Sequence, residues 1–165
     1  MNAKPPKRPV LLAGSWEESA TPLDVVNPYD GTVVASTFAA GEAELERATQ
    51  AAVAAAPGMR RLAAYERAEI LARAGDELRR RREEIGRTIA AEVGKAIRDA
   101  LAEADRGVQT FQAAAEEARR IAGEEIPIDL APHGKGRLAF TRRFPIGPVA
   151  AISPFNFPFN LAAHK

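Results

Sequence analysis

The sequence predicts an α/β protein with strands first, helices in the middle and a strand–loop–helix unit at the end. Three observations predict this class. β-Branched residues cluster around turn signals between residues 10 and 38. Alanine-rich segments with apolar residues three and four apart then occupy residues 42–122. Finally, the apolar run Val149–Ile152 leads into a proline-bracketed loop, which is typical of a strand buried in a parallel sheet.

Composition narrows the possible functions. The 165 residues allow one domain or part of a larger one. The 23 basic and 22 acidic residues nearly cancel, so no overall field favours nucleic acid or an anionic membrane. There is no cysteine, which excludes disulfides, thiolate metal sites and a cysteine nucleophile within this chain. No secretory pattern or membrane-length apolar run occurs, so we expect a cytoplasmic protein.

The N-terminal segment predicts a short tail followed by a β-meander. Residues 1–9 are rich in proline and charge and are expected to be disordered. Asn27–Thr32 contains the turn dipeptides Asn-Pro and Asp-Gly, which favour a hairpin between the runs on either side. Three strands are therefore predicted: Val10–Leu12, Leu23–Val26 and Val33–Phe38.

Four helices are predicted before Gly123. Pro57 and Gly58 should end the first helix, and Gly94 should end the third. The fourth carries the strongest apolar stripe, and half of the stripe is alanine, which favours packing on a helix or sheet over a self-standing coiled coil. The predicted ranges are Glu42–Ala56, Ala63–Arg82, Ile85–Val93 and Ile97–Ala122.

A second hairpin is predicted after the helices. Its arms, Glu125–Leu130 and Arg137–Phe144, alternate apolar and charged residues around a glycine-containing loop, so one face should meet solvent or a partner. The basic run Arg79–Arg82 is better explained as a solvated helix face paired with acids than as a phosphate site. The two histidines, His133 and His164, have no neighbours at ligand spacing, so no metal site is predicted.

The closing segment contains the strongest candidate for chemistry. Pro154 and Pro158 keep the residues before them extended and place Asn156 on a loop beyond Val149–Ile152. Its side-chain N–H could donate to an oxyanion, or it could only form an Asx-turn within the loop. Asn160 and the histidine four residues later share a helix face, either as a polar pocket wall or as a partly exposed surface.

The segment Ile152–Pro158 resembles the Pro-Trp/Phe-Asn-Phe-Pro motif of the aldehyde dehydrogenase superfamily. The resemblance extends from about Leu11 to the end and corresponds to roughly the first third of a family member. Other landmarks agree in order: Asn27–Thr32, Glu92–Lys95, Arg143–Val149 and Ala163–Lys165.

The resemblance implies the first part of the aldehyde dehydrogenase fold: a β-meander, four helices, an oligomerisation-type hairpin and the first strand–loop–helix of a Rossmann-like domain. The implied divisions are a tail at 1–9, the N-terminal part of the cofactor-binding domain at 10–123, the hairpin at 124–144 and the Rossmann-like unit at 145–165. Family members oxidise aldehydes to carboxylic acids with NAD or NADP. A cysteine thiolate adds to the carbonyl, and a glutamate-activated water hydrolyses the thioester.

The resemblance also implies roles for the closing loop and helix. Asn156 would donate to the oxyanion formed from the aldehyde. The residues that would lie along NAD or NADP, largely through their backbone, are Ile152, Ser153, Pro154 and Phe155. Those that would face the aldehyde tunnel are Phe157, Asn160 and His164. The form of the motif with Phe155, followed by Ala163–Lys165, is similar to that of the branch that acts on small polar aldehydes. Lactaldehyde dehydrogenases and non-phosphorylating glyceraldehyde-3-phosphate dehydrogenases are examples of this branch.

The nucleophilic cysteine and glutamate base of the family would lie beyond Lys165. We therefore expect an N-terminal fragment that is inactive alone, from a parent enzyme that forms a homodimer or homotetramer. The alternative is a non-catalytic interaction or oligomerisation module that uses the 97–122 stripe and the 125–144 hairpin. A parent reading frame that continues into a segment with a reactive cysteine would distinguish the two.

Overall fold

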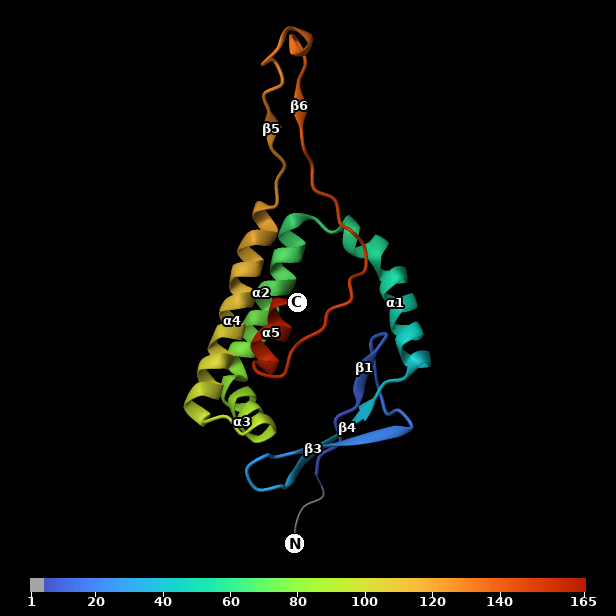
Figure 1. The fold of residues 1–165 in the computed structure, drawn as a ribbon, viewed down its shortest axis with the longest axis vertical. Coiled ribbons are helices and arrows are strands. Elements are labelled where there is room, and N and C mark those ends of the chain that lie inside the picture. Colours follow the sequence, from blue (N-terminus) through green and yellow to red (C-terminus); the bar gives the residue numbers. More distant parts are fainter. Residues whose placement is uncertain (1–4) are drawn as a thin grey trace.

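The computed structural model describes residues 5–165. Helices α2, α3, α4 and α5 lie together, and α1 stands apart from them (Figure 1). The N-terminal strands lie at one end of the molecule, and a long hairpin projects from the other (Figure 1). In the described part of the chain, no helix is long and apolar enough to cross a membrane.

The N-terminal strands form two antiparallel pairs. β1 (Val10–Leu12) pairs with β2 (Ser15–Glu17), and β3 (Thr21–Val26) pairs with β4 (Val33–Ala39). The hairpin prediction is confirmed: the N–H of Asn27 donates to the carbonyl of Thr32 at 2.8 Å across the turn. β2 was not predicted because Ser-Trp-Glu contains no β-branched residue.

The predicted tail is only partly described, since residues 1–4 lie outside the described range. Residues 5–9 are not a free tail. The N–H of Ser36 donates to the carbonyl of Pro6 at 3.1 Å, and the N–H of Arg8 donates to the carbonyl of Ser36 at 2.7 Å. This segment therefore covers part of the exposed edge of β4, a contact between distant segments that local composition does not encode.

The helices largely follow the predicted periodicity. They are α1 (Glu42–Arg61), α2 (Ala64–Arg80), α3 (Arg82–Val93), α4 (Ile97–Arg120) and α5 (Pro158–His164). The predicted end of α1 before Pro57 is wrong, because the helix continues to Arg61. A proline inside a helix removes one hydrogen bond but holds φ near the helical value, so an exposed helix can continue through it.

The core lies where α4 packs on α2, α3 and α5 of the same chain. Small residues permit these close approaches. Gly86 of α3 faces α4 so closely that a Cβ there would lie 2.5 Å from a methyl group of Leu101. Ile97, at the start of the predicted stripe, is exposed. The buried apolar side chains of the bundle are Ala68, Ile89, Ala100, Ala104, Val108 and Ala118.

The second hairpin is present, but its strands are shorter than predicted. β5 (Glu125–Ile126) pairs antiparallel with β6 (Ala139–Phe140), and a 3₁₀ turn, η1 (Pro132–Gly134), forms its tip. Pro127 follows β5 directly, and its missing N–H cannot continue the ladder. The hairpin stands clear of the helices (Figure 1).

The predicted buried strand at residues 149–152 is wrong for this structure. The segment contains no strand, and Val149 and Ile152 are 73% and 86% exposed. A strand needs a hydrogen-bonded neighbour, and none of the described strands pairs with these residues. The segment instead runs as an extended connection from the hairpin to α5 (Figure 1).

Candidate active site

The loop that precedes α5 presents Asn156 to solvent. Pro158 occupies the first turn of α5, where its missing N–H is not needed. The backbone carbonyl of Asn156 accepts a hydrogen bond from the Lys95 ammonium at 3.1 Å. Its exposed side-chain amide has no hydrogen-bond partner among residues 5–165, so the Asx-turn alternative is not realised here. The amide is therefore free to donate to a ligand.

Glu103, on α4, fixes the beginning of α5. Its side chain is fully buried, at 0% exposure. Oxygen Oε1 accepts from the backbone N–H of Phe159 at 3.0 Å and from that of Asn160 at 3.2 Å. These are N–H groups of the first turn, which have no partner within the helix. A carboxylate from a neighbouring helix thus supplies both the cap and the negative charge that a helix N-terminus favours.

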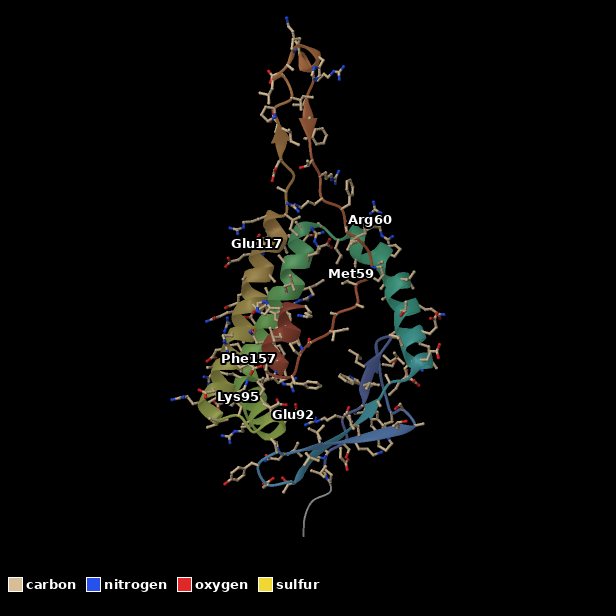
Figure 2. All side chains as sticks on the ribbon, in the orientation of Figure 1. Met59, Arg60, Glu92, Lys95, Glu117 and Phe157 are labelled. Atoms are coloured by element: carbon tan, nitrogen blue, oxygen red, sulfur yellow. The ribbon has the colours of Figure 1, made fainter. Side chains whose placement is uncertain are left out.

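Lys95 connects Glu103 to the loop. It follows Gly94, whose left-handed backbone (φ 65°) ends α3 and turns the chain toward α4. The ammonium forms an ion pair with Oε2 of Glu103. It also lies 4.3 Å from the centre of the Phe157 ring (Figure 2). Lys95 therefore contacts the loop at both the Asn156 carbonyl and the neighbouring aromatic ring.

Arg106 brings a second positive charge to the same ring. Its guanidinium carbon lies 4.9 Å from the centre of Phe157. The side chain is exposed and forms no ion pair within residues 5–165. The loop that carries Asn156 is thus bordered by a cation that no described carboxylate neutralises.

Asn160 points into the bundle. It is 9% exposed, and its Oδ1 accepts a hydrogen bond from the Thr110 hydroxyl at 3.4 Å. His164, one turn further along α5, is exposed. The structure therefore buries the Asn160 side chain and exposes that of His164. A role for Phe157, Asn160 or His164 in an aldehyde tunnel stays a prediction.

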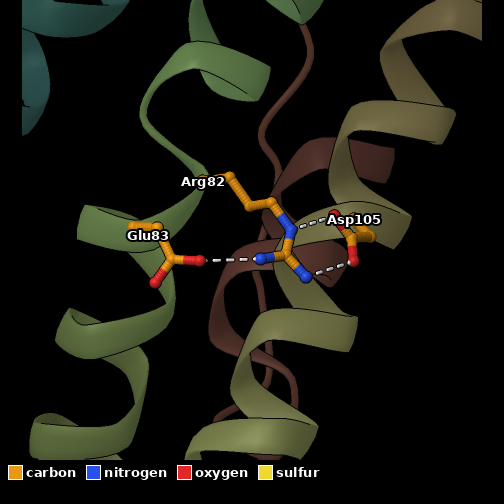
Figure 3. Close-up of polar contacts among 3 residues, drawn as sticks. All are labelled: Arg82, Glu83 and Asp105. Atoms are coloured by element: carbon orange, nitrogen blue, oxygen red, sulfur yellow. Dashed lines mark hydrogen bonds and ion pairs between the residues drawn. The ribbon is translucent and has the colours of Figure 1, made fainter.

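The basic run is a paired, solvated surface, as the sequence indicated. Arg82 holds both oxygens of Asp105, at 2.6 and 2.9 Å, and donates to Glu83 at 2.9 Å (Figure 3). These hydrogen bonds lower the pKa of Asp105. Each of the three preceding arginines pairs with an acid three residues away in sequence. Within residues 5–165, no cluster of three or more candidate ligands could hold a metal ion.

Comparison with known proteins identifies the family. A family profile described as "Aldehyde dehydrogenase family" matches residues 16–165. The chain belongs to the aldehyde dehydrogenase family. It is 41% identical over 156 residues to the 3-sulfolactaldehyde dehydrogenase of Priestia megaterium, which covers 94% of this chain and 32% of the relative. It is 35% identical to the lactaldehyde dehydrogenase of Methanocaldococcus jannaschii, with the same coverage.

Solved aldehyde dehydrogenases share the fold, so the predicted fold class is confirmed. Aldehyde dehydrogenase 21 from Physcomitrella patens, in complex with the reaction product succinate, superposes with a TM-score of 0.93 at 44% identity, over 99% of this chain and 34% of that one. The NADP-dependent glyceraldehyde-3-phosphate dehydrogenase of Bacillus halodurans, complexed with NADP, gives 0.89 at 34% identity, over 95% and 34%. The chain thus spans about a third of the length of its aldehyde dehydrogenase relatives.

The residues expected along the cofactor form the exposed connection before Asn156. Phe155 is 91% exposed, and the other three are also exposed: Ile152, Ser153 and Pro154. Their backbone groups form no strand pairing among the described residues, so they are available to a ligand or another segment. Cofactor contact by these residues stays a prediction.

Three charged residues of the site were not identified from sequence. In the sequence, Lys95 appears only as the end of a family landmark, and no local pattern marks Arg106. One signal was present: Glu103 interrupts a helix face whose neighbours Ala100, Ala104 and Gly107 are small and buried. A carboxylate among buried small residues requires partners, and this requirement points to a polar network.

Proposed function

We propose that this chain is the amino-terminal part of an NAD(P)-dependent aldehyde dehydrogenase that oxidises a small polar aldehyde to its carboxylic acid. The observation that carries the proposal is the free amide of Asn156, exposed on a loop whose backbone is anchored by Lys95. Family membership supports the assignment to an aldehyde dehydrogenase, and the greater length of the relatives supports a longer parent enzyme. The exposed apolar connection, including Ile146 and Val149, also supports a larger protein that covers it.

Asn156 performs its role when a thiolate adds to the aldehyde carbon. Negative charge then develops on the former carbonyl oxygen, and the Nδ2–H of Asn156 donates a hydrogen bond to it. The thiolate comes from outside residues 1–165, since this chain has no cysteine, and the base that activates water is proposed to lie outside them as well. NAD or NADP, when bound, would supply the acceptor for the hydride that leaves the aldehyde carbon. The exposed backbone at 152–155 fits a role in lining that cofactor.

The test of this function is Asn156→Ala in the full-length enzyme. Loss of one oxyanion donor should lower kcat by about 10²-fold with little change in KM. Gln109→Ala, which removes an exposed amide from α4, serves as the matched control and should keep wild-type turnover. Wild-type kcat in Asn156→Ala would refute the oxyanion role.

We further propose that the aldehyde carries an anionic group. Arg106 lies beside Phe157 with no described acid in an ion pair, so its charge is available to a substrate. Some relatives are named for aldehydes that carry an anionic group, including 3-sulfolactaldehyde and glyceraldehyde 3-phosphate. A guanidinium binds sulfonate, phosphate and carboxylate through paired N–H donors.

Arg106→Met in the full-length enzyme tests this specificity. The value of kcat/KM should fall about 10- to 100-fold for glyceraldehyde 3-phosphate, because a charge-assisted contact is lost. The value for lactaldehyde should change by less than about threefold. Arg98→Met, at an exposed site earlier on α4, is the control. Equal losses for both substrates, or hexanal preferred over both by the wild type, would contradict the proposal.

The hairpin of residues 124–144 is proposed to contact a second copy of the enzyme in a homodimer or homotetramer. This proposal is supported by the apolar side chains that the projecting hairpin exposes, which are Leu130, Leu138 and Phe140 (Figure 1). This contact accounts for the alternating pattern of the arms without requiring a separate, non-catalytic role.

A further inference from the structure

We propose that Glu103 is a positioning residue that, through Lys95 and the first turn of α5, fixes Asn156 in the orientation needed for catalysis. This inference rests on the proposed oxyanion role of Asn156. Glu103 touches neither the Asn156 side chain nor any group that reacts. It acts through the backbone on both sides of the loop.

The anchors enclose a short segment. At its start, Lys95 holds the carbonyl of Asn156 at 3.1 Å. Three residues later, Glu103 holds the N–H groups of Phe159 and Asn160. Because Lys95 is itself paired with Glu103, one buried carboxylate fixes both ends. Pro158 removes backbone freedom between them, so little conformational freedom is left to the Asn156 backbone.

The buried charge gives this arrangement its strength. Glu103 is fully buried, and the Lys95 side chain is only 19% exposed, so solvent screens the pair weakly. Two amide donors and one ammonium satisfy the carboxylate. α5 has only seven residues, and a helix of this length forms in water only when tertiary contacts hold it. The cap from Glu103 is one such contact.

Glu103→Gln separates positioning from simple packing. Glutamine has the same size and can keep an oxygen toward the amides of Phe159 and Asn160. Its NH₂ group, however, faces the Lys95 ammonium, which has no second carboxylate among its described ion pairs. Lys95 is then expected to leave the Asn156 carbonyl, although α5 still packs on α4.

The decisive experiment uses the full-length enzyme with Glu103→Gln, Asn156→Ala and the double variant. Glu103→Gln should lower kcat about tenfold while KM changes less than about twofold. In the Asn156→Ala background, Glu103→Gln should have no further effect, because residues that act as a unit are not additive. Asp105→Asn is the matched control: it removes another carboxylate of α4, the one paired with Arg82 of α3, and should leave kcat unchanged.

The outcomes separate the two proposals. If Asn156→Ala lowers kcat and Glu103→Gln does not, the positioning role is refuted and the oxyanion role stands. If Asn156→Ala keeps wild-type kcat, the proposed function itself fails. If Glu103→Gln lowers kcat equally in both backgrounds, it acts independently of Asn156 and the inference is again overturned.

A second measurement needs no activity and also uses the full-length enzyme. In Glu103→Gln, amide hydrogen exchange at Phe159 and Asn160 should accelerate about tenfold relative to wild type, because a charge-assisted bond becomes a neutral one. Lys95→Met serves if the glutamine variant does not fold, and Lys95→Arg should restore protection. Unchanged exchange in both Glu103→Gln and Lys95→Met would overturn the proposal.

Discussion

Glu92 illustrates how the bundle perturbs a single charge. It lies on α3, three residues before Lys95, and lines a groove of about 420 Å³ with Arg8, Thr88 and Pro158. Burial raises the pKa of Glu92 above its ordinary 4.5, and the charge of Arg8 offsets part of this effect. The folded state therefore favours the protonated carboxyl more than the unfolded state does.

This perturbation predicts a pH-dependent effect of Glu92→Gln. Below the ordinary pKa, Glu92 is protonated in both states and the two proteins should have equal free energies of unfolding. As pH rises through the raised pKa, wild type loses stability because ionisation costs more in the folded state. The variant should thus be the more stable near pH 7. Urea titrations at about pH 4 and pH 7 measure this, and a pH-independent difference would contradict it.

At the scale of elements, the depth at which α5 lies on α4 is set by Gly107. The Phe159 ring occupies the space that a Cβ on Gly107 would need. On the buried face of α4, Gly107 therefore limits how closely α5 can approach, and Glu103 caps the N-terminus of α5. Packing and electrostatics fix the same short helix.

Gly107→Ala should consequently displace α5. The added methyl meets the Phe159 ring, and overpacking of this kind typically costs about 1–3 kcal/mol, more than the gain in helix propensity. Gly58→Ala is the control, since nothing lies near its position in α1, and it should be neutral or stabilising by up to about 1 kcal/mol. Thermal unfolding measures both. Equal melting temperatures for the two variants would show that the contact does not constrain α5.

Periodicity predicted α2, α3 and α4 within a few residues, because the buried face of an amphipathic helix is visible in the spacing of apolar residues along the local sequence. Periodicity could not predict that α1 continues beyond Pro57. Whether a helix passes through a proline depends on whether the rest of the helix compensates for one missing hydrogen bond. The strand at 149–152 was predicted from apolarity, but its formation depends on a neighbouring strand. The loop with Asn156 was found from its prolines and family motif. Glu103 and Lys95 were missed because their partners are distant in sequence.

At the scale of the whole molecule, two regions with exposed apolar side chains follow α4 in the chain. One is the connection that contains Ile146 and Val149, and the other is the hairpin that projects from the opposite end to the N-terminal strands (Figure 1). Apolar patches of this kind mark surfaces that another segment or subunit covers. The first is proposed to meet the rest of the same enzyme, and the second a neighbouring subunit.

Phe140→Asp in the full-length enzyme tests the role of the hairpin. A buried, unpaired charge in an interface should shift the assembly toward monomers by about 10-fold or more in dissociation constant. Tyr29→Asp, at an exposed turn at the other end of the molecule, is the control. Light scattering after size-exclusion chromatography measures the masses. An unchanged assembly with Phe140→Asp would place the subunit interface elsewhere.

The most direct test of the account is the single-turnover rate of aldehyde oxidation by the full-length Asn156→Ala variant. This rate isolates formation of the oxyanion and loss of the two electrons from later hydrolysis and product release. The oxyanion role predicts a first step about 10²-fold slower than wild type at saturating aldehyde. A first step as fast as wild type would contradict the central claim that Asn156 stabilises the reacting oxygen.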